Sequence, residues 1–190
     1  DDYISDELLG KKFVISPNSF YQVNHAQCEK LYSKARDYAN LGGDEVLLDL
    51  YCGVGTIGLT MADRVKQLVG IEIIPQAIEN AKINAKLNNI DNAKFICADA
   101  PKGAEILKSE GIKPDVIILD PPRKGCAPSL FDTVCQMNPK RIVYVSCDSS
   151  TLARDLKILE EKGYKTKKVS AVDMFPRTPH IEAVALIEKI

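Results

Sequence analysis

Short apolar runs alternate with helical stretches along most of this chain, and that alternation restricts the fold more than any other feature of the sequence. The runs occupy residues 45–50, 66–73, 93–98, 115–120 and 141–146, and the clearest helical stretches are 75–89 and 149–163. Because the runs are apolar nearly throughout, strands formed by them are buried on both faces. Helices that connect such strands cover the two faces of a parallel sheet, so we predict an α/β domain.

The two ends of the chain depart from this alternation. Residues 165–175 and 181–189 are β-rich and are separated only by PRTPH, which predicts an antiparallel pair at the edge of the sheet. Before the first run, residues 1–43 are predicted to be an N-terminal loop and a helix over His25–Leu41 that stops at the glycine pair 42–43. With 190 residues and no linker-like segment, the chain is expected to form one domain over 1–190.

Seven strands that end in an antiparallel hairpin are typical of the class I S-adenosylmethionine-dependent methyltransferase fold, whereas a dinucleotide-binding domain usually continues with parallel strands. We therefore predict a seven-stranded, mostly parallel sheet with an antiparallel C-terminal hairpin. Ligands of open α/β sheets bind at the carboxyl ends of the strands, so the residues that follow each run are the candidates for a functional site.

Composition argues against several classes of protein. No stretch reaches the roughly 18 apolar residues of a membrane-spanning helix, and the first residues lack the order of a signal peptide, so we expect a cytoplasmic protein without membrane contact. The six cysteines form no CxxC pair and the two histidines complete no zinc spacing, which predicts free thiols and no bound metal.

The charge of the chain is unevenly distributed. The net charge is −1, which by itself does not indicate nucleic-acid binding. Residues 121–190, however, carry 12 Lys and Arg against eight Asp and Glu. Either this segment faces a polyanion or the excess is ordinary surface charge, and composition leaves both interpretations open.

The first run leads into a glycine-rich loop, DLYCGVGTIG (49–58). Its glycines permit a tight turn and a close approach of the backbone to a ligand, just before a helix N-terminus. The loop also satisfies the GxGxxG pattern of dinucleotide sites. The carboxylate of Asp49 favours S-adenosylmethionine instead, because it can hold the methionine amino group or orient the loop, whereas it would repel a pyrophosphate.

Acidic residues also follow the next two runs. Glu72 ends the second run, where a carboxylate can accept hydrogen bonds from both ribose hydroxyls, and Asp99 follows the third, where it can receive the adenine amino group. Glu72 also has a bland interpretation as a solvated strand-end charge, and for Asp99 a non-functional role stands on equal terms. Together with Asp49, the two acids favour a nucleoside cofactor more strongly than any one of them alone.

Asp120 begins the segment DPPRKG (120–125), which follows the fourth run. The two prolines fix the backbone and remove two N–H donors, which predicts a rigid platform beside the cofactor. Enzymes that methylate amino groups often have an aromatic residue after such a platform, whereas this chain has Arg123, so an exocyclic amine is the less favoured target. The alternative interpretation is a basic surface loop.

Cys147 follows the fifth run, directly before a helix that Asp148 or Ser149 can cap. The N-terminus of that helix is expected to lower the pKa of the thiol toward the nucleophilic thiolate. Alternatively, Cys147 is a small buried hydrophobe, as cysteines usually are. We assign structural positions to the other five cysteines, Cys28, Cys52, Cys97, Cys126 and Cys135.

Glu182 stands at the start of the last predicted strand, behind a connection pinned by Pro176 and Pro179. An acid in this position, over the carboxyl edge of the sheet, is placed to act as a base. The alternative is an edge-strand charge that blocks pairing with another sheet.

Six segments together resemble the catalytic domain of the RNA uracil-5 methyltransferases, the family of the ribosomal and transfer RNA 5-methyluridine enzymes. They are YQVN (21–24), LDLYCGVGTIGL (48–59), GIEIIPQAIENA (70–81), DPPRKG (120–125), VSCDSSTLARDL (145–156) and DMFPRTPHIEAVAL (173–186). The resemblance implies that Cys147 is the nucleophile and Glu182 the base. The S-adenosylmethionine contacts that it implies are Gln22, Tyr51, Glu72 and Asp120, with Gly53 and Asp99 as neighbours.

The resemblance also implies a reaction, the transfer of a methyl group from S-adenosylmethionine to carbon 5 of a uridine in RNA through a bond between Cys147 and carbon 6. Ribosomal RNA is favoured over transfer RNA as the substrate. Family members carry upstream RNA-binding and central domains, which we expect to be absent from this chain. Two other functions stay open: methylation of an RNA cytosine or amino group, and a nucleotide-binding module without catalysis in which Cys147 belongs to the core.

Overall fold

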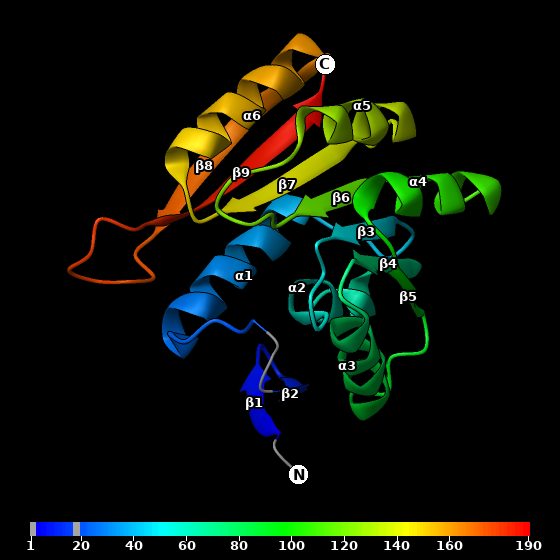
Figure 1. Cartoon of the computed structure of the whole chain (residues 1–190), viewed down its shortest axis with the longest axis vertical. Helices are drawn as coiled ribbons and strands as arrows, with labels where there is room; N and C mark the ends of the chain where they lie inside the picture. Colours follow the sequence, from blue (N-terminus) through cyan, green and yellow to red (C-terminus); the bar gives the residue numbers. More distant parts are fainter. Residues whose placement is uncertain (1–2, 17–19) are drawn as a thin grey trace.

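The structure, a computed structural model, describes residues 3–16 and 20–190 (Figure 1). The strands are β1 (Ile4–Leu8), β2 (Lys11–Ile15), β3 (Val46–Leu50), β4 (Gln67–Glu72), β5 (Ala93–Cys97), β6 (Val116–Leu119), β7 (Arg141–Ser146), β8 (Tyr164–Val172) and β9 (Glu182–Lys189). The helices are α1 (His25–Ala39), α2 (Thr56–Leu59), α3 (Pro75–Leu87), α4 (Ala100–Ser109), α5 (Pro128–Met137) and α6 (Ser149–Glu161), with a 3₁₀ turn at Ala62–Arg64.

Strands β3 to β9 form one seven-stranded sheet in the order β5-β4-β3-β6-β7-β9-β8. Neighbours from β5 to β7 are parallel, whereas β9 runs antiparallel to both β7 and β8. The predicted fold class, a mostly parallel sheet with an antiparallel C-terminal hairpin, is therefore confirmed. The hairpin is not wholly at the edge, because β9 inserts between β7 and β8 and leaves only β8 exposed to solvent along that side.

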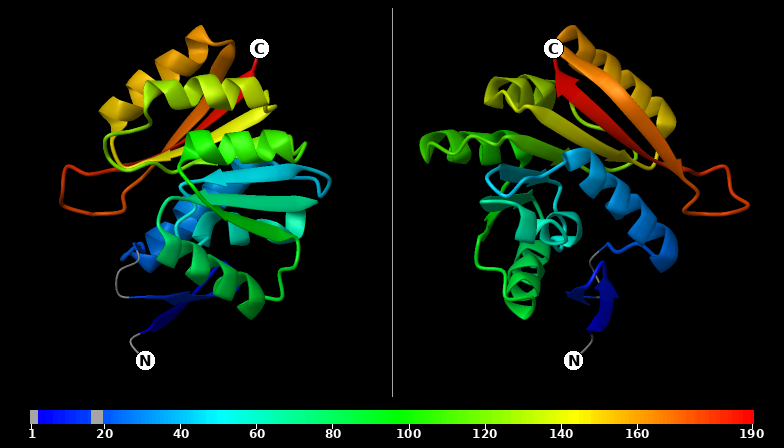
Figure 2. Two further views of the ribbon diagram at one scale, coloured as in Figure 1. Left: turned by 45° about the vertical axis from the view of Figure 1, so that its right-hand side comes forward. Right: turned by 180° about the vertical axis from the view of Figure 1, so that it is seen from behind.

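Helices cover both faces of this sheet (Figure 2). Side chains of α1, α2 and α3 pack in one core, and side chains of α4, α5 and α6 pack in the other. Successive strand residues point to opposite faces, so Leu47 belongs to the first core and its neighbour Leu48 to the second. This burial on both sides explains why the strands are apolar at nearly every position rather than at alternate ones.

The N-terminal segment is a hairpin rather than the predicted loop. Strands β1 and β2 pair antiparallel in the register Ile4↔Ile15, around a turn in which Leu9 and Gly10 both have positive φ, 51° and 76°. A two-residue turn of this kind suits the twist of a hairpin. The sequence concealed it because β1 is largely polar and exposed. Residues 1–2 and 17–19 of the predicted loop lie outside the described residues.

Asparagine side chains on α3 dock this hairpin onto the domain. The Asn84 side chain accepts a hydrogen bond from the amide of Val14 (2.7 Å) and donates to its carbonyl (3.2 Å). One turn further along, Asn88 does the same with Lys12, at 2.8 and 2.6 Å. The side-chain amides therefore bond to β2 as a neighbouring strand would. Asn84 also donates to the carbonyl of Val54 in the glycine-rich loop (3.1 Å).

Asparagines also delimit α1. The Asn24 side chain accepts from the amide of Gln27 (3.3 Å) and donates to the carbonyl of Met174 (3.0 Å), which ties the segment before β9 to the start of α1. We predicted that α1 stops at Gly42 and Gly43, but it ends at Asn40, where φ is 44°. Asparagine tolerates this left-handed conformation better than most residues, so no glycine is needed there.

Candidate active site

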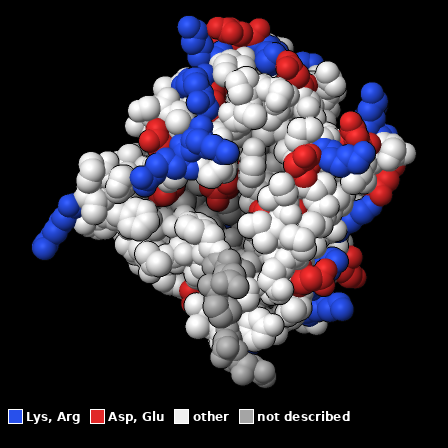
Figure 3. Space-filling view, in the orientation of Figure 1, with Lys and Arg blue, Asp and Glu red and all other residues white. Residues whose placement is uncertain are grey.

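Three acidic residues meet at the carboxyl edge of the sheet because β4, β3 and β6 are parallel neighbours. Glu72 is the last residue of β4, Asp49 is the penultimate residue of β3, and Asp120 follows β6 directly. Figure 3 shows a hollow in the middle of the face seen in Figure 1, with acidic side chains inside it and Lys and Arg side chains gathered beside it.

Asp49 orients the glycine-rich loop. Its Oδ2 accepts a hydrogen bond from the amide of Gly58 at 2.9 Å, and a Cβ at Gly58 would lie 2.8 Å from that oxygen, so only glycine permits the approach. Within the described part of the chain, the buried Oδ1 of Asp49 has no hydrogen-bond partner. Burial, reinforced by the charge of Glu72, raises the pKa of Asp49 to about 7. A buried unpaired oxygen of this kind suits a donor from a ligand, such as an ammonium group.

The Glu72 carboxylate joins the end of β4 to the same loop. Its Oε2 accepts from the amide of Gly53 (3.2 Å), and its Oε1 accepts from the amides of Ile73 (2.8 Å) and Ile74 (3.0 Å). Glu72 is half-buried, and its carboxylate accepts hydrogen bonds from three backbone amides. A solvated charge at a strand end would have neither property. Gly53 has a φ of 55°, which keeps the loop in a left-handed conformation that favours glycine.

A cavity of about 160 Å³ lies between the ends of β3, β4 and β5 and the start of α5. Its lining is mostly apolar, with a few polar side chains: Tyr51, Ile71, Glu72, Ile73, Ala98, Asp99, Ala100, Pro101, Ala127, Ser129 and Leu130. An apolar slot with a few polar groups at its rim suits a flat heterocycle attached to a sugar. The cavity and the unpaired oxygen of Asp49 therefore fit the nucleoside and amino groups of S-adenosylmethionine.

The predicted cofactor residues are distributed unevenly around this cavity. Tyr51, Glu72 and Asp99 line it, and Gly53 is bonded to Glu72. Asp99 has a structural role as well, because its side chain caps α4 by accepting from the amide of Lys102 (2.8 Å).

Gln22 and Asp120, the other two predicted contacts, lie outside this lining. Gln22 is buried in the segment between β2 and α1. Asp120 lies at the end of β6, where burial, followed by the charges of Glu182 and Asp49, raises its pKa to about 8. Asp120 therefore lies close both to Asp49, which holds the glycine-rich loop, and to Glu182, which belongs to a second group of site residues.

That second group is centred on Cys147 and Glu182, at the end of the β7–β9 ladder. The last pair of this ladder is Ser146 and Ala183; Cys147 follows Ser146, and Glu182 precedes Ala183. The charge of Glu182 contributes to the raised pKa of Cys147, which also indicates that the two side chains are close. Glu182 is only 4% exposed and begins an interior strand, so its interpretation as an edge-strand charge is wrong.

The pKa of Cys147 is raised, so the predicted lowering by the helix N-terminus is wrong. Burial is the largest cause and the charge of Glu182 the next, whereas a hydrogen bond from Arg123 opposes them. The amides of Ser150 and Thr151, in the first turn of the helix, do not compensate, because they donate their hydrogen bonds to Asp148, at 3.0 and 2.9 Å. Asp148 is thus the predicted cap of α6.

Arg123 interacts with both members of the pair. Burial raises the pKa of Glu182, and the charge of Arg123 opposes that rise. The segment DPPRKG is exposed at Arg123 and Lys124, and Arg154 of α6 is exposed beside it. The segment is therefore both a basic surface loop and part of the site.

The remaining cysteines differ in burial. All six lie in the described part of the chain and are free thiols. Cys28, Cys52 and Cys126 are buried and Cys135 is half-buried, in keeping with structural positions. Cys97 is exposed instead, because it ends the edge strand β5.

Sequence reasoning missed Asp155, a fully buried carboxylate on α6. It accepts hydrogen bonds from the hydroxyl of Tyr144 (2.6 Å) and from the amide of Cys126 (2.9 Å). The sequence does contain a feature that could have revealed this buried acid. Asp155 falls at helical spacing between Leu152 and Leu159, on the apolar face of α6. A carboxylate in an apolar stripe needs partners, and these lie beside the DPPRKG segment.

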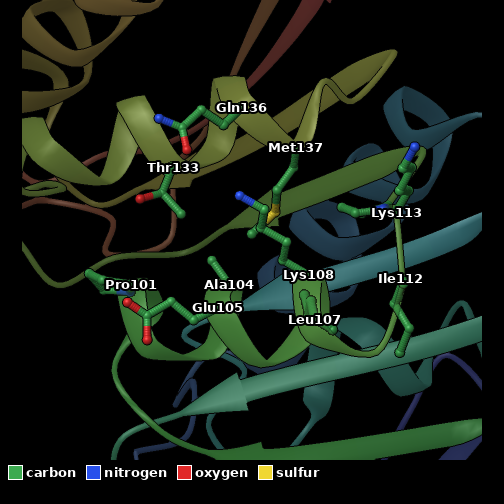
Figure 4. A pocket seen from close by; sticks show the side chains of 12 residues that line it. Pro101, Ala104, Glu105, Leu107, Lys108, Ile112, Lys113, Thr133, Gln136 and Met137 are labelled. Atoms are coloured by element: carbon green, nitrogen blue, oxygen red, sulfur yellow. The ribbon is translucent and has the colours of Figure 1, made fainter.

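A larger cavity of about 490 Å³ opens between α4 and α5 (Figure 4). Its lining comes from those two helices and from residues 111–114, the connection that leads into β6. It shares only Pro101 with the cavity at the strand ends, and none of the predicted site residues lines it.

No helix in the described part of the chain is apolar over a length sufficient to cross a bilayer. Within residues 3–16 and 20–190, no group of three or more His, Cys, Asp or Glu side chains is placed to hold a metal ion.

The fold and the two groups of site residues define a class I S-adenosylmethionine-dependent methyltransferase fold with its functional residues at the carboxyl edge. Residues 1–190 match the family described as tRNA (Uracil-5-)-methyltransferase, and the chain belongs to that family.

Similar proteins include an RNA methyltransferase of Oceanobacillus iheyensis, which is 51% identical over 97% of this chain and 40% of its own length. A relative from Clostridium tetani is 52% identical over 98% of this chain and 40% of its own length. The crystal structure of Pyrococcus abyssi tRNA (uracil-54, C5)-methyltransferase in complex with S-adenosyl-L-homocysteine superposes with a TM-score of 0.83 at 36% identity, over 98% of this chain and 44% of that one. The chain thus spans about two fifths of the length of these relatives.

Proposed function

We propose that this chain binds S-adenosylmethionine and transfers its methyl group to carbon 5 of a uridine in RNA. The observation that carries the proposal is the proximity of Cys147 and Glu182, which flank the last pair of the β7–β9 ladder at the carboxyl edge of the sheet. A nucleophile and a base on the same side of the substrate are what methylation of this carbon requires. Membership of the uracil-5 family supports the choice of target atom.

The cofactor supplies an electrophilic methyl group, and the first group of residues would hold it. Glu72 and Asp99 would accept hydrogen bonds from the ribose and the adenine, respectively, beside the ring of Tyr51. The unpaired Oδ1 of Asp49 would accept from the amino group of the methionine part. For Gln22 and Asp120, cofactor contact rests on the family resemblance alone.

Cys147 makes the uracil reactive. Carbon 5 of uracil is too weak a nucleophile to attack the methyl group directly. The thiolate adds to carbon 6, and the electron pair of the C5–C6 bond moves toward the ring carbonyl to give an enolate. Arg123 supplies positive charge beside the thiol, where it favours the thiolate and can stabilise the enolate oxygen.

Glu182 completes the reaction. After methylation, carbon 5 carries both the new methyl group and its original proton. The Glu182 carboxylate takes that proton, the electron pair re-forms the C5–C6 double bond, and the sulfur of Cys147 leaves as the thiolate. The raised pKa of Glu182 makes its carboxylate a stronger base than an exposed glutamate.

Two RNA classes are candidates for the substrate. The sequence alone favours ribosomal RNA, whereas the neighbour from Pyrococcus abyssi is named as a transfer RNA enzyme. A uridine stacked in a helix hides the face that Cys147 must attack, so the target must be flipped out or lie in a loop. We propose the cytoplasm as the compartment, because such RNA is found there.

Release of tritium from RNA that carries 5-tritiated uridine tests the proposal. The full-length protein should release one tritium for each methyl group transferred, because Glu182 removes the label as a proton. Methyl transfer without release of label would support methylation of a cytosine or an amino group instead. Cofactor binding with neither release nor transfer on ribosomal or transfer RNA would support a nucleotide-binding module.

A further inference from the structure

An ion pair between the exposed Arg154 and the buried Asp155 lies in the middle of α6, next to the segment that carries Arg123. Asp155 is 0% exposed, and its Oδ1 accepts a hydrogen bond from Nε of Arg154 at 2.8 Å. A second guanidinium nitrogen lies 2.7 Å from the same oxygen. A carboxylate this deeply buried is costly unless it is paired and fully hydrogen-bonded.

Both partners also bond to the loop between β6 and α5. The Oδ2 of Asp155 accepts from the amide of Cys126 at 2.9 Å. Arg154 donates to the carbonyl of Lys124 (3.1 Å) and to that of Cys126 (3.3 Å). The backbone on either side of Gly125 is therefore held by one pair of side chains.

Gly125 lets the loop approach this pair. Its φ is 74°, and a Cβ there would lie 2.6 Å from a guanidinium nitrogen of Arg154 and 2.7 Å from Oδ2 of Asp155. One turn earlier on α6, the hydroxyl of Thr151 lies 3.2 Å from the carbonyl of Arg123 and 3.2 Å from that of Asp148, and its proton is shared between these two acceptors. Positions 151, 154 and 155 share one face of the helix, and that face holds the backbone of residues 123–126.

The Arg123 side chain needs such support because it is exposed. An exposed arginine is free to leave its partner unless its backbone is fixed. We propose that Thr151, Arg154 and Asp155 are positioning residues that hold the β6–α5 loop so that Arg123 stays against the Cys147 thiol. This inference rests on the proposed function, in which Cys147 is the nucleophile.

The balance of charges around the Cys147 thiol depends on where the Arg123 side chain lies. Glu182 faces it from β9, Asp120 faces it from the end of β6, and Arg123 faces it from the loop. The two acids disfavour the thiolate and Arg123 favours it. Displacement of Arg123 would therefore leave the thiol facing two carboxylates.

Alkylation of Cys147 by iodoacetamide, measured against pH by peptide mass spectrometry, tests the proposal without RNA. Cys97 is exposed and serves as an internal reference in the same sample. Thr151→Val removes the hydroxyl that reaches Arg123, and Thr151→Ser keeps it. Arg154→Met removes both carbonyl contacts, and Lys157→Met removes a charge from the exposed face of the same helix.

Thr151→Val, Arg154→Met and Asp155→Asn should each move the alkylation profile of Cys147 to higher pH. The rate at pH 8 should fall by roughly three- to tenfold, as expected for a thiol that loses a cationic partner. The alkylation rate of Cys97 should not change in any of these variants. In the controls Thr151→Ser and Lys157→Met, the alkylation profiles of both Cys147 and Cys97 should match the wild type. Addition of Arg154→Met to Arg123→Gln should have no further effect, because the two act through the same contact.

Cys147 profiles that overlay the wild type in Thr151→Val and Arg154→Met, with a lower unfolding temperature, would show that the network only stabilises the fold. If Asp155→Asn fails to fold, the comparison of Thr151→Val with Thr151→Ser, and of Arg154→Met with Lys157→Met, still tests the positioning role. The assay is also independent of the proposed reaction. A shifted profile in a full-length protein that methylates no uridine would refute the proposed function and leave the positioning role intact.

Discussion

Glu182 and Cys147 flank the last pair of the β7–β9 ladder, because Glu182 precedes Ala183 and Cys147 follows Ser146. Backbone hydrogen bonds of two interior strands therefore bring the proposed base and the proposed nucleophile to the same end of the ladder. A site placed on strand ends is held more precisely than one carried by loops alone. This relationship makes the two residues testable as a pair with distinct roles.

Replacement of Cys147 by alanine should abolish methyl transfer by the full-length protein, with a loss of roughly 10³-fold or more, because no thiolate can add to carbon 6. Cofactor affinity measured by calorimetry should stay within about twofold, since Cys147 lies outside the cofactor cavity. Cys135→Ala is the matched control, a half-buried thiol on α5. Substantial transfer by Cys147→Ala would exclude the covalent mechanism.

Glu182→Gln should block the reaction at a later stage. The amide cannot take the proton from carbon 5, so addition and methylation proceed and elimination does not. A protein–RNA adduct that survives a denaturing gel should accumulate with the full-length variant. Glu188→Gln, further along the same strand, should form no such band. Normal turnover by Glu182→Gln would contradict its role as the base.

Glu72→Ala should weaken cofactor binding by about 1.5 to 3 kcal/mol, or roughly 10- to 150-fold, if the carboxylate accepts from both ribose hydroxyls. Calorimetry with S-adenosylhomocysteine measures the change. Glu79→Ala removes an exposed carboxylate from α3 and serves as the control. Equal affinities in the two variants would remove Glu72 from the cofactor site.

The stability of the cofactor-free chain should fall as the pH rises from 5 to 8. Burial raises the pKa of Asp49 to about 7 in the folded chain, so the folded state holds the proton more tightly than the unfolded state does. The contribution of the bound proton is fully present below the unfolded pKa, declines as the pH rises above that value, and is lost as the pH passes the folded pKa. Urea unfolding should show a loss of roughly 2 kcal/mol from this residue.

Asp49→Asn should remove that part of the pH dependence, because the amide oxygen still accepts from Gly58 and carries no charge. Asp120, with a pKa raised to about 8, contributes in the same direction and remains in the variant. Parallel wild-type and Asp49→Asn curves between pH 5 and 8 would contradict the assignment.

Asn84→Ala should cost about 2 to 3 kcal/mol of unfolding free energy, because it leaves backbone groups of Val14 and Val54 without their partner. Asn88→Ala should cost less, since its contacts with Lys12 are exposed. Urea unfolding measures both. Equal losses would show that the bonds of Asn84 add nothing beyond those of an exposed asparagine.

The sheet and the acids at its carboxyl edge were largely predictable because their signals are local. Apolar runs mark strands that are buried on both faces, and the acid at the end of each run marks the carboxyl edge. Asp49, Glu72 and Asp99 were predicted in this way. The β1–β2 hairpin was not, because its first strand is polar and its stability depends on asparagines some 70 residues further along.

The electrostatic properties of the second group were not predictable from spacing. The direction of the Cys147 pKa depends on Glu182, which is distant in sequence and adjacent only through β9. The role of Asp155 depends on Cys126 and Tyr144 in the same way. Interactions of this kind are properties of the assembled sheet, and no window of sequence contains them.

The insertion of β9 between β7 and β8 has a consequence for biosynthesis. A ribosome delivers β7 first, then β8, and only then the strand that must lie between them. During that interval the side of β7 that will receive β9 stays open, and Cys147 has no partner across it. Until residues 182–189 have left the ribosome, the chain therefore lacks both the strand that closes this gap and Glu182, the base of the proposed reaction.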